Sequence, residues 1–206
     1  MKPSKIYDLI KSSVYTKSGD DVDWTTLVDH EEKKVYLLFQ QSVSKRDWQN
    51  NFNFPVKLYK NQQSCLKVAR GWGDAYKSCN DDIMRILITR HNDNPDYEVY
   101  ICGWSYGGAM AVIASEDFYF RTGIKPHLVT FGAPKPLFGK DTLSYVKSCL
   151  ADAVQYAHRN DLVTVLPPFI GYRHVNKVEL GKFDLFKIFK VVDFHRGYRN
   201  EDWYER

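Results

Sequence analysis

Short apolar runs alternate along the chain with segments of helical periodicity. Four runs have strand length and are rich in β-branched and aromatic residues, at 34–39, 97–102, 128–131 and 153–157. Apolar residues recur at helical spacing over 72–90 and 142–150, and 105–115 is small and apolar around the whole helix circumference. This alternation predicts an α/β fold with a mostly parallel central sheet and helices on both faces.

The last part of the chain has a less regular pattern. Residues 183–192 combine alternating and continuous apolar positions, which favours a β-hairpin strand packed on the sheet. The alternative is a basic, aromatic surface that contacts a membrane. Because no low-complexity tract or Pro/Gly/Ser-rich linker divides the sequence, we expect residues 1–206 to form one domain.

The composition excludes several classes of protein. Hydrophobic residues make up 44% of the 206 residues and charged residues 26%, a balance typical of globular chains. The net charge of +4 comes from 29 basic and 25 acidic residues with no basic block, so nucleic-acid binding is not favoured. The four cysteines form no C-x-x-C pair, and we expect reduced, mostly buried thiols and no metal site, at Cys65, Cys79, Cys102 and Cys149.

The amino-terminal residues show no leader pattern. Charges interrupt residues 1–11 before any apolar stretch reaches the length of a signal-peptide core. In addition, no window approaches the ~18 uncharged apolar residues of a membrane span. We therefore expect a protein that stays in the cytoplasm or is released by lysis.

The pattern G-x-S-x-G occurs at Gly103, Ser105 and Gly107, where an expected strand ends and an expected buried helix begins. A tight strand-to-helix turn needs small residues two positions before and after the serine. It also exposes the Ser105 hydroxyl at a helix N-terminus, where backbone N–H groups stabilise negative charge. Ser105 is therefore a candidate nucleophile.

A neutral serine needs a base and a group that orients the base. In hydrolases with this turn, the acid and then the histidine follow the serine along the chain. Asp161 is favoured among the later acids because it closely follows the expected strand 153–157. Two histidines, His174 and His195, lie beyond it, and this order of residues leaves either one as the base.

Five motifs resemble those of the class 3 lipases, α/β-hydrolases that include fungal triacylglycerol lipases and feruloyl esterases. GWSYGGA at 103–109 is similar to the family's G-H-S-L-G-G-A, TFGAPK at 130–135 to T-F-G-x-P-R, and NDLVTVLPP at 160–168 to N-D-x-V-P-x-L-P-P. Upstream, FQQSVSKRDW at 39–48 is similar to F-R-G-T-x-S-x-x-D-W, and KVARGW at 67–72 to V-H-x-G-F. The resemblance runs from about residue 35 to 195. It implies an α/β-hydrolase-like fold and ester hydrolysis through an acyl-enzyme.

The resemblance also implies a role for individual residues. Ser105 is the nucleophile, Asp161 the orienting acid, and His195 the base, in a motif similar to the family's late D/x-H-x-x-Y. His174 ends a segment that resembles G-Y-x-H, whose histidine is not catalytic. The oxyanion hole is formed by Ser42 and the backbone N–H of Tyr106. No metal or organic cofactor is required.

Several positions depart from the family pattern. Trp104 and Tyr106 replace the usual His and Leu beside the serine, and we expect both aromatic side chains to line the substrate cleft. Gln41 replaces the Gly before the oxyanion residue, and a residue with a Cβ adopts left-handed backbone less readily. The segment 43–52, an amphipathic lid in fungal lipases, is mostly polar here. We therefore expect a minimal polar lid, weak interfacial activation and short-chain or partly soluble esters as substrates.

Two other functions compete with that of a lipase or esterase. A phospholipase or lysophospholipase would use the basic segment around Lys182, Lys187 and Lys190 at an anionic lipid surface. A hydrolase fold kept as a non-catalytic binding module is the second alternative. The expected partners are an ester or lipid substrate and, through peripheral contact, a lipid interface. The sequence favours no particular oligomeric state.

Overall fold

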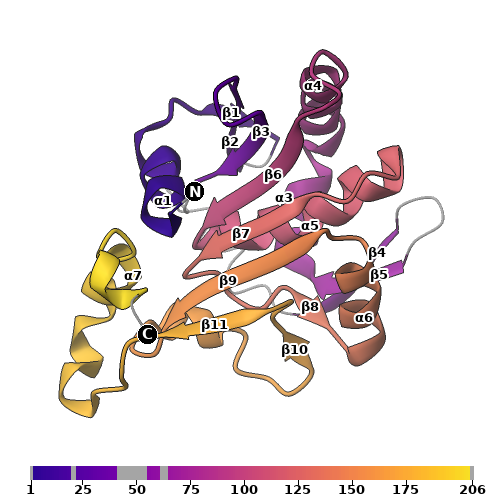
Figure 1. Ribbon diagram of the computed structural model, residues 1–206. Coiled ribbons are helices and arrows are strands. Elements are labelled where there is room, and N and C mark those ends of the chain that lie inside the picture. The colour runs from indigo at the N-terminus through magenta and orange to yellow at the C-terminus, as the bar shows by residue number, and fades with distance from the viewer. Residues whose placement is uncertain (1, 20–21, 41–54, 61–64, 205–206) are drawn as a thin grey trace.

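The computed structural model of the chain describes residues 2–19, 22–40, 55–60 and 65–204 (Figure 1). A seven-stranded sheet lies at its centre, in the spatial order β1-β2-β3-β6-β7-β9-β11. These strands are β1 (Thr16–Ser18), β2 (Val22–Asp29), β3 (Lys34–Phe39), β6 (Glu98–Trp104), β7 (His127–Phe131), β9 (Asp152–His158) and β11 (Lys177–Leu180). The strands from β3 to β11 are parallel, and β1 and β2 add an antiparallel edge.

A smaller antiparallel sheet accompanies the central one. Its order is β10-β8-β5-β4. The strands are β4 (Val56–Lys60), β5 (Cys65–Ala69), β8 (Leu137–Phe138) and β10 (Tyr172–Arg173). Strand β8 lies in the connection that follows β7, and β10 lies in the connection that follows β9. Because β8 pairs with both β10 and β5, the smaller sheet holds these two connections in place.

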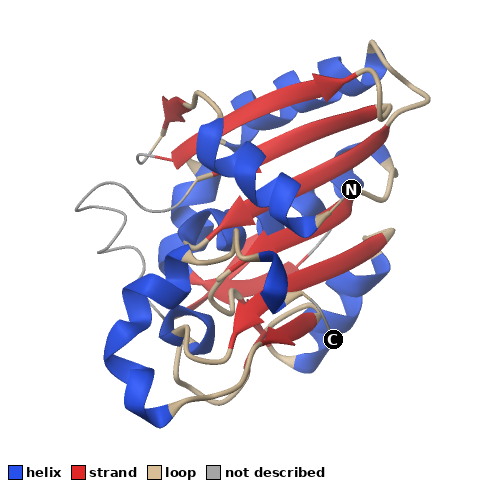
Figure 2. Cartoon of the chain, turned by 60° about the vertical axis from the view of Figure 1, so that its left-hand side comes forward, coloured by secondary structure: helices blue, strands red, loops and turns tan. Residues whose placement is uncertain are grey.

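Helices cover both faces of the central sheet (Figure 2). The side chains of α3 (Arg70–Lys77), α4 (Asn80–Asn92), α5 (Tyr106–Thr122) and α6 (Lys140–Ser148) share one apolar core with Val35, Leu37 and Phe39 of β3. The alternate residues Tyr36 and Leu38 pack on the other face against α1 (Pro3–Ser12) and the C-terminal residues. Successive side chains of β3 point to opposite faces of the sheet, and both faces are covered. Strand β3 therefore appears in the sequence as a continuous apolar run.

The expected fold class, an α/β-hydrolase-like sheet with helices on both faces, is confirmed. The parallel strands end on the side where the C-terminal helix α7 (Val191–Arg196) lies, as the arrowheads of β6, β7 and β9 show in Figure 1. Residues that follow these strands therefore meet at one edge of the sheet. The expected polar lid at 43–52 lies outside the described residues, as do Gln41 and Ser42.

The single helix expected over 72–90 is wrong, because the chain forms two helices there. The first, α3, ends at Lys77, and the Ser78 hydroxyl donates to the Ala75 carbonyl at 2.7 Å. The second, α4, begins at Asn80 with Asp81 and Asp82 in its first turn. A serine that binds a carbonyl of the preceding turn and acids at a helix N-terminus both favour a break at this point.

The β-hairpin strand expected at 183–192 is also wrong. The segment forms the 3₁₀ helix η2 (Leu185–Lys190) followed by α7. Strand β11 ends before Gly181, whose φ of +65° turns the chain out of the sheet. The Asp184 carboxylate then accepts from the Phe186 N–H at 3.0 Å and starts a helical turn.

Two other expectations concern thiols and membrane spans. Cys79, Cys102 and Cys149 are buried thiols that form no disulfide among the described residues, as expected from the sequence. Burial raises the pKa of the Cys102 thiol well above its usual range, so this thiol stays protonated. None of the helices in the described ranges has the length and apolarity that crossing a lipid bilayer would require.

Candidate active site

Ser105 occupies a sharp turn between β6 and α5. Its backbone has φ 58° and ψ −126°, a region that residues with a Cβ rarely adopt. The Ser105 N–H donates to the Phe131 carbonyl of the neighbouring strand at 2.9 Å, which holds the turn against the sheet. A strained residue held in this way is typical of functional positions.

The glycines around Ser105 allow the turn to close. A Cβ on Gly103 would collide with the backbone of Gly107, and one on Gly107 would collide with the carbonyls of Phe39 and Gln40. Both collisions are with backbone atoms, which cannot move aside as a flexible side chain can. The small residues expected on either side of the serine are therefore a steric requirement of this turn.

Three side chains from distant parts of the chain form a hydrogen-bonded series at this edge of the sheet. His195 Nε2 lies 2.7 Å from Ser105 Oγ, and His195 Nδ1 lies 2.9 Å from Asp161 Oδ2. The serine comes from the β6–α5 turn, the carboxylate from the residue before η1 (Leu162–Val165), and the imidazole from α7. This is the geometry of a nucleophile beside a base whose ring is oriented by a buried acid.

Asp161 is held by more than the histidine. Its Oδ1 accepts from the Val163 N–H at 3.1 Å, and its Oδ2 accepts from the Tyr198 hydroxyl at 2.8 Å. Burial raises the pKa of Tyr198 well above its usual value, so the phenol keeps its proton and donates to Asp161. The same hydroxyl accepts from the His158 N–H at 2.9 Å. The sequence does not indicate that Tyr198, three residues after His195, contacts the acid.

Gly132 lies directly against the acid and the base. Its φ is +56°, and a Cβ at this position would lie 2.7 Å from Asp161 Oδ2 and 3.0 Å from His195 Nδ1. The T-F-G motif of the sequence thus places a residue without a side chain where the Asp161–His195 pair needs space. The motif itself does not reveal this role of the glycine, because Asp161 and His195 are distant from it in the chain.

The backbone of α7 is anchored from beneath by two aromatic side chains. Trp104 Nε1 donates to the His195 carbonyl at 2.9 Å, and the Tyr7 hydroxyl donates to the Arg196 carbonyl at 3.1 Å. Trp104 has an exposed fraction of 0%, with its ring centroid 5.6 Å from that of Tyr7. We expected Trp104 to line the substrate cleft. Its burial instead places it under His195, because the even-numbered side chains of β6 point to the α1 face.

Tyr106 begins helix α5 next to the serine. The N–H groups in the first turn of a helix stabilise negative charge, so the Tyr106 N–H is a candidate oxyanion donor. The Tyr106 side chain is 3% exposed and belongs to the core on the α3–α6 face, not to an open cleft. The second expected donor, Ser42, lies outside the described residues.

His174, the other candidate base, lies elsewhere. It directly follows β10, and its Nε2 is 2.8 Å from the Thr164 carbonyl of η1. Burial lowers its pKa to about 4. The structure thus brings His195, rather than His174, to Ser105.

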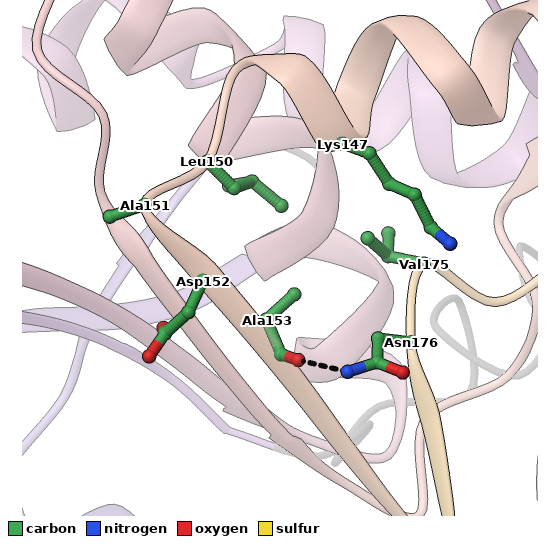
Figure 3. Close-up of a pocket in the computed structure, with 7 residues that line it drawn as sticks. All are labelled: Lys147, Leu150, Ala151, Asp152, Ala153, Val175 and Asn176. Carbon is green, nitrogen blue, oxygen red and sulfur yellow. Dashed lines mark hydrogen bonds between the residues drawn. The ribbon is translucent and has the colours of Figure 1, made fainter.

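Two surface pockets lie away from the triad. One, of about 330 Å³, is lined at the start of β9 by Lys147, Leu150, Ala151, Asp152, Ala153, Val175 and Asn176 (Figure 3). The other, of about 150 Å³, lies between α1 and the sheet. The first is at the opposite end of β9 from Asp161, and neither pocket is lined by Ser105, His195 or Asp161.

The family model that matches this chain and two of its curated relatives are described as lipases. The model of the family described as "Lipase (class 3)" matches residues 36–170. A secreted mono- and diacylglycerol lipase 1 of Fusarium solani is 28% identical over 170 residues, which cover 82% of this chain and 49% of that protein. A secreted mono- and diacylglycerol lipase A of Penicillium cyclopium is 28% identical over 171 residues, covering 82% and 53%. The chain thus spans about half the length of these curated relatives.

A solved structure is similar over most of the chain. It is described as a triacylglycerol lipase whose catalytic centre is a serine protease triad. The TM-score is 0.73 at 25% identity, and the match covers 82% of this chain and 66% of the other. The names of the Fusarium and Penicillium relatives contradict the expected cytoplasmic location or release by lysis, because both are secreted proteins.

Proposed function

The chain belongs to the class 3 lipase family, and from this premise we propose that it hydrolyses carboxylic esters, lipid esters among them, through an acyl-enzyme on Ser105. The observation that carries the proposal is the series of hydrogen bonds from Ser105 Oγ through His195 to Asp161. A serine is activated by a neighbouring base, and the base is held in one tautomer by a carboxylate on its other nitrogen. The same arrangement in a related solved structure supports this reading.

The proposed reaction has two similar halves. His195 Nε2 removes the Ser105 proton while Oγ attacks the ester carbonyl, and the imidazolium then gives that proton to the leaving alcohol. Water replaces the alcohol, His195 takes a proton from it, and the acyl group leaves as a carboxylic acid while Ser105 recovers its proton. The Asp161 carboxylate accepts from His195 Nδ1–H and stabilises the imidazolium that forms. The proposed oxyanion donors are the Tyr106 N–H and Ser42.

The proposed substrate class follows from the relatives. Two of them are named mono- and diacylglycerol lipases, so acylglycerols are the natural lipid esters to test on this chain. The polar composition of 43–52 favours substrates that are short-chain or partly soluble. A matched set of monoacylglycerol, diacylglycerol and p-nitrophenyl esters separates these preferences.

The test is hydrolysis of p-nitrophenyl esters from acetate to palmitate by the wild type and Ser105→Ala. We expect activity in the wild type and a loss of about 10⁶ in kcat in the variant. The control is Ser115→Ala on the same helix, where the buried hydroxyl only donates to the Ala111 carbonyl. Equal rates for wild type and Ser105→Ala would contradict the proposal, whereas equal rates for wild type and Ser115→Ala are expected.

A further inference from the structure

Large apolar side chains are exposed on the segment that leads into His195. Phe186 is 96% exposed and Leu185 65%, and Phe183 and Val192 are more than half exposed. Leu162, the residue after Asp161, is 39% exposed. We call these five residues the apolar rim. Single exposed apolar residues are ordinary, but five on adjoining elements mark an interaction surface.

The apolar rim is fixed beside the candidate active site. The buried Asn160 side chain holds the segment, since its Nδ2 donates to the Asp184 carbonyl at 2.7 Å and its Oδ1 accepts from the Asp184 N–H at 3.0 Å. Asn160 directly precedes Asp161, and α7 packs against both η1 and η2. Val192 is three residues from His195 on α7. The rim therefore adjoins the helix that carries His195, and Figure 1 shows this helix, α7, at the edge where the parallel strands end.

Exposed basic side chains surround the apolar rim. Lys182 precedes it, and Lys190 and Arg196 lie within or just after it. Asp193 is the exposed acid of this stretch. The balance of exposed charges within 182–196 is thus positive among the described side chains. Aromatic and aliphatic groups flanked by lysine and arginine are typical of surfaces that lie in the headgroup region of an anionic lipid layer.

We propose that the apolar rim is the surface by which this chain docks on an anionic lipid–water interface, with Phe186 and Leu185 inserted and Lys182 and Lys190 at the headgroups. The proposal rests on the proposed function and names the face that a lipid layer meets. Ser105 itself is 8% exposed. A rim that adjoins the helix carrying His195 brings an ester held in a lipid layer close to Ser105.

The test is co-sedimentation with vesicles of phosphatidylcholine, with and without phosphatidylglycerol, in the Ser105→Ala background so that no ester is hydrolysed. We expect Leu185→Gln/Phe186→Gln to weaken binding to both kinds of vesicle by at least about tenfold. Lys182→Gln/Lys190→Gln should weaken binding to the phosphatidylglycerol vesicles by about fivefold per charge and leave the neutral vesicles unaffected.

Matched controls lie at the other end of α5. Ile124→Gln replaces an apolar side chain that is 38% exposed, and Lys125→Gln/Lys147→Gln removes two exposed charges. Both controls should bind vesicles as the Ser105→Ala parent does. Unchanged binding by the Leu185/Phe186 variant, or an equal loss in the Ile124 variant, would overturn the proposal. A Leu185/Phe186 variant that differs from its parent in gel-filtration mass but binds vesicles equally well would also overturn it. That result would assign the apolar rim to contact with a second copy of the chain.

A second readout separates this proposal from the proposed function. With Ser105 present, Leu185→Gln/Phe186→Gln should hydrolyse soluble p-nitrophenyl acetate at the wild-type kcat/KM but lose activity on vesicle-borne acylglycerol. A wild type inactive on the soluble ester contradicts the proposed function, while the binding comparison still judges the apolar rim. Full activity of the variant on vesicle-borne ester would overturn the docking proposal even if the chemistry holds.

Discussion

Single residues around Asp161 decide whether the acid and base keep their geometry. Ser105 could be predicted from the sequence because its signal is local: a serine between glycines where a strand meets a helix. The contacts of Asp161 could not, because Tyr198 and Gly132 reach it from 37 and 29 residues away in the chain. A linear pattern contains no information about which distant side chains share a carboxylate.

Replacement of Gly132 by alanine should lower kcat on a soluble ester by at least about tenfold. The added Cβ meets the Asp161–His195 pair, and a displacement of these groups by a fraction of an ångström misaligns the base. The control is Gly123→Ala, where φ is also positive, at +73°, but a Cβ would meet nothing within 4 Å. Steady-state kinetics of both variants check this, and an equal kcat for the two would refute it.

Tyr198→Phe should reduce kcat about tenfold and leave KM for a small ester nearly unchanged. The substitution removes a donor to the buried Asp161 and leaves the buried His158 N–H without its acceptor. Tyr145→Phe is the matched control, because its hydroxyl also donates to a buried carboxylate, Glu116, at 2.9 Å. If Tyr198 only stabilises the fold, both variants will lose stability and neither will lose kcat.

At the scale of elements, His195 lies on α7, a short helix that follows all the strands of the central sheet in the chain. The apolar runs predicted the strands well because a buried parallel strand is apolar on both sides, whatever its neighbours. The tail was predicted wrongly because Phe183, Leu185, Phe186 and Val192 are exposed rather than buried. Asn160 and Gly181 determine the path of this segment. Residues 72–90 were predicted as a single helix because the spacing of apolar residues does not reveal the break at Ser78.

Trp104→Phe tests the anchoring of α7. Phenylalanine keeps an aromatic ring in the core but cannot donate to the His195 carbonyl, so we expect kcat to fall severalfold more than stability loss alone explains. Trp72→Phe removes an equally buried indole on the opposite face of the sheet and serves as control. The comparison requires kcat and urea-unfolding curves for both. A similar kcat in the two variants would contradict an anchoring role.

At the scale of the whole molecule, we expect His174 to make the stability of the fold sensitive to acid. Its pKa is about 4 in the folded chain, against about 6.5 for an ordinary histidine, so the unfolded chain binds the proton more readily. Stability from this group is therefore full above pH ~6.5 and is lost as the pH falls toward ~4, by about 2 to 3 kcal/mol. We expect His174→Gln, whose amide can still donate to Thr164, to lose less stability than the wild type over this range.

Urea unfolding at about pH 7 and about pH 4.5 measures this difference. A wild type and a His174→Gln variant with parallel stability curves would show that His174 does not contribute.

The most direct test of the central claim is covalent labelling with a fluorophosphonate, followed by peptide mass spectrometry. We predict one adduct per chain on Ser105, formed quickly by the wild type and at least about a hundredfold more slowly by His195→Gln, because the base no longer activates the hydroxyl. His174→Gln should label like the wild type. Labelling of a residue other than Ser105, or an equal rate in His195→Gln, would contradict the account.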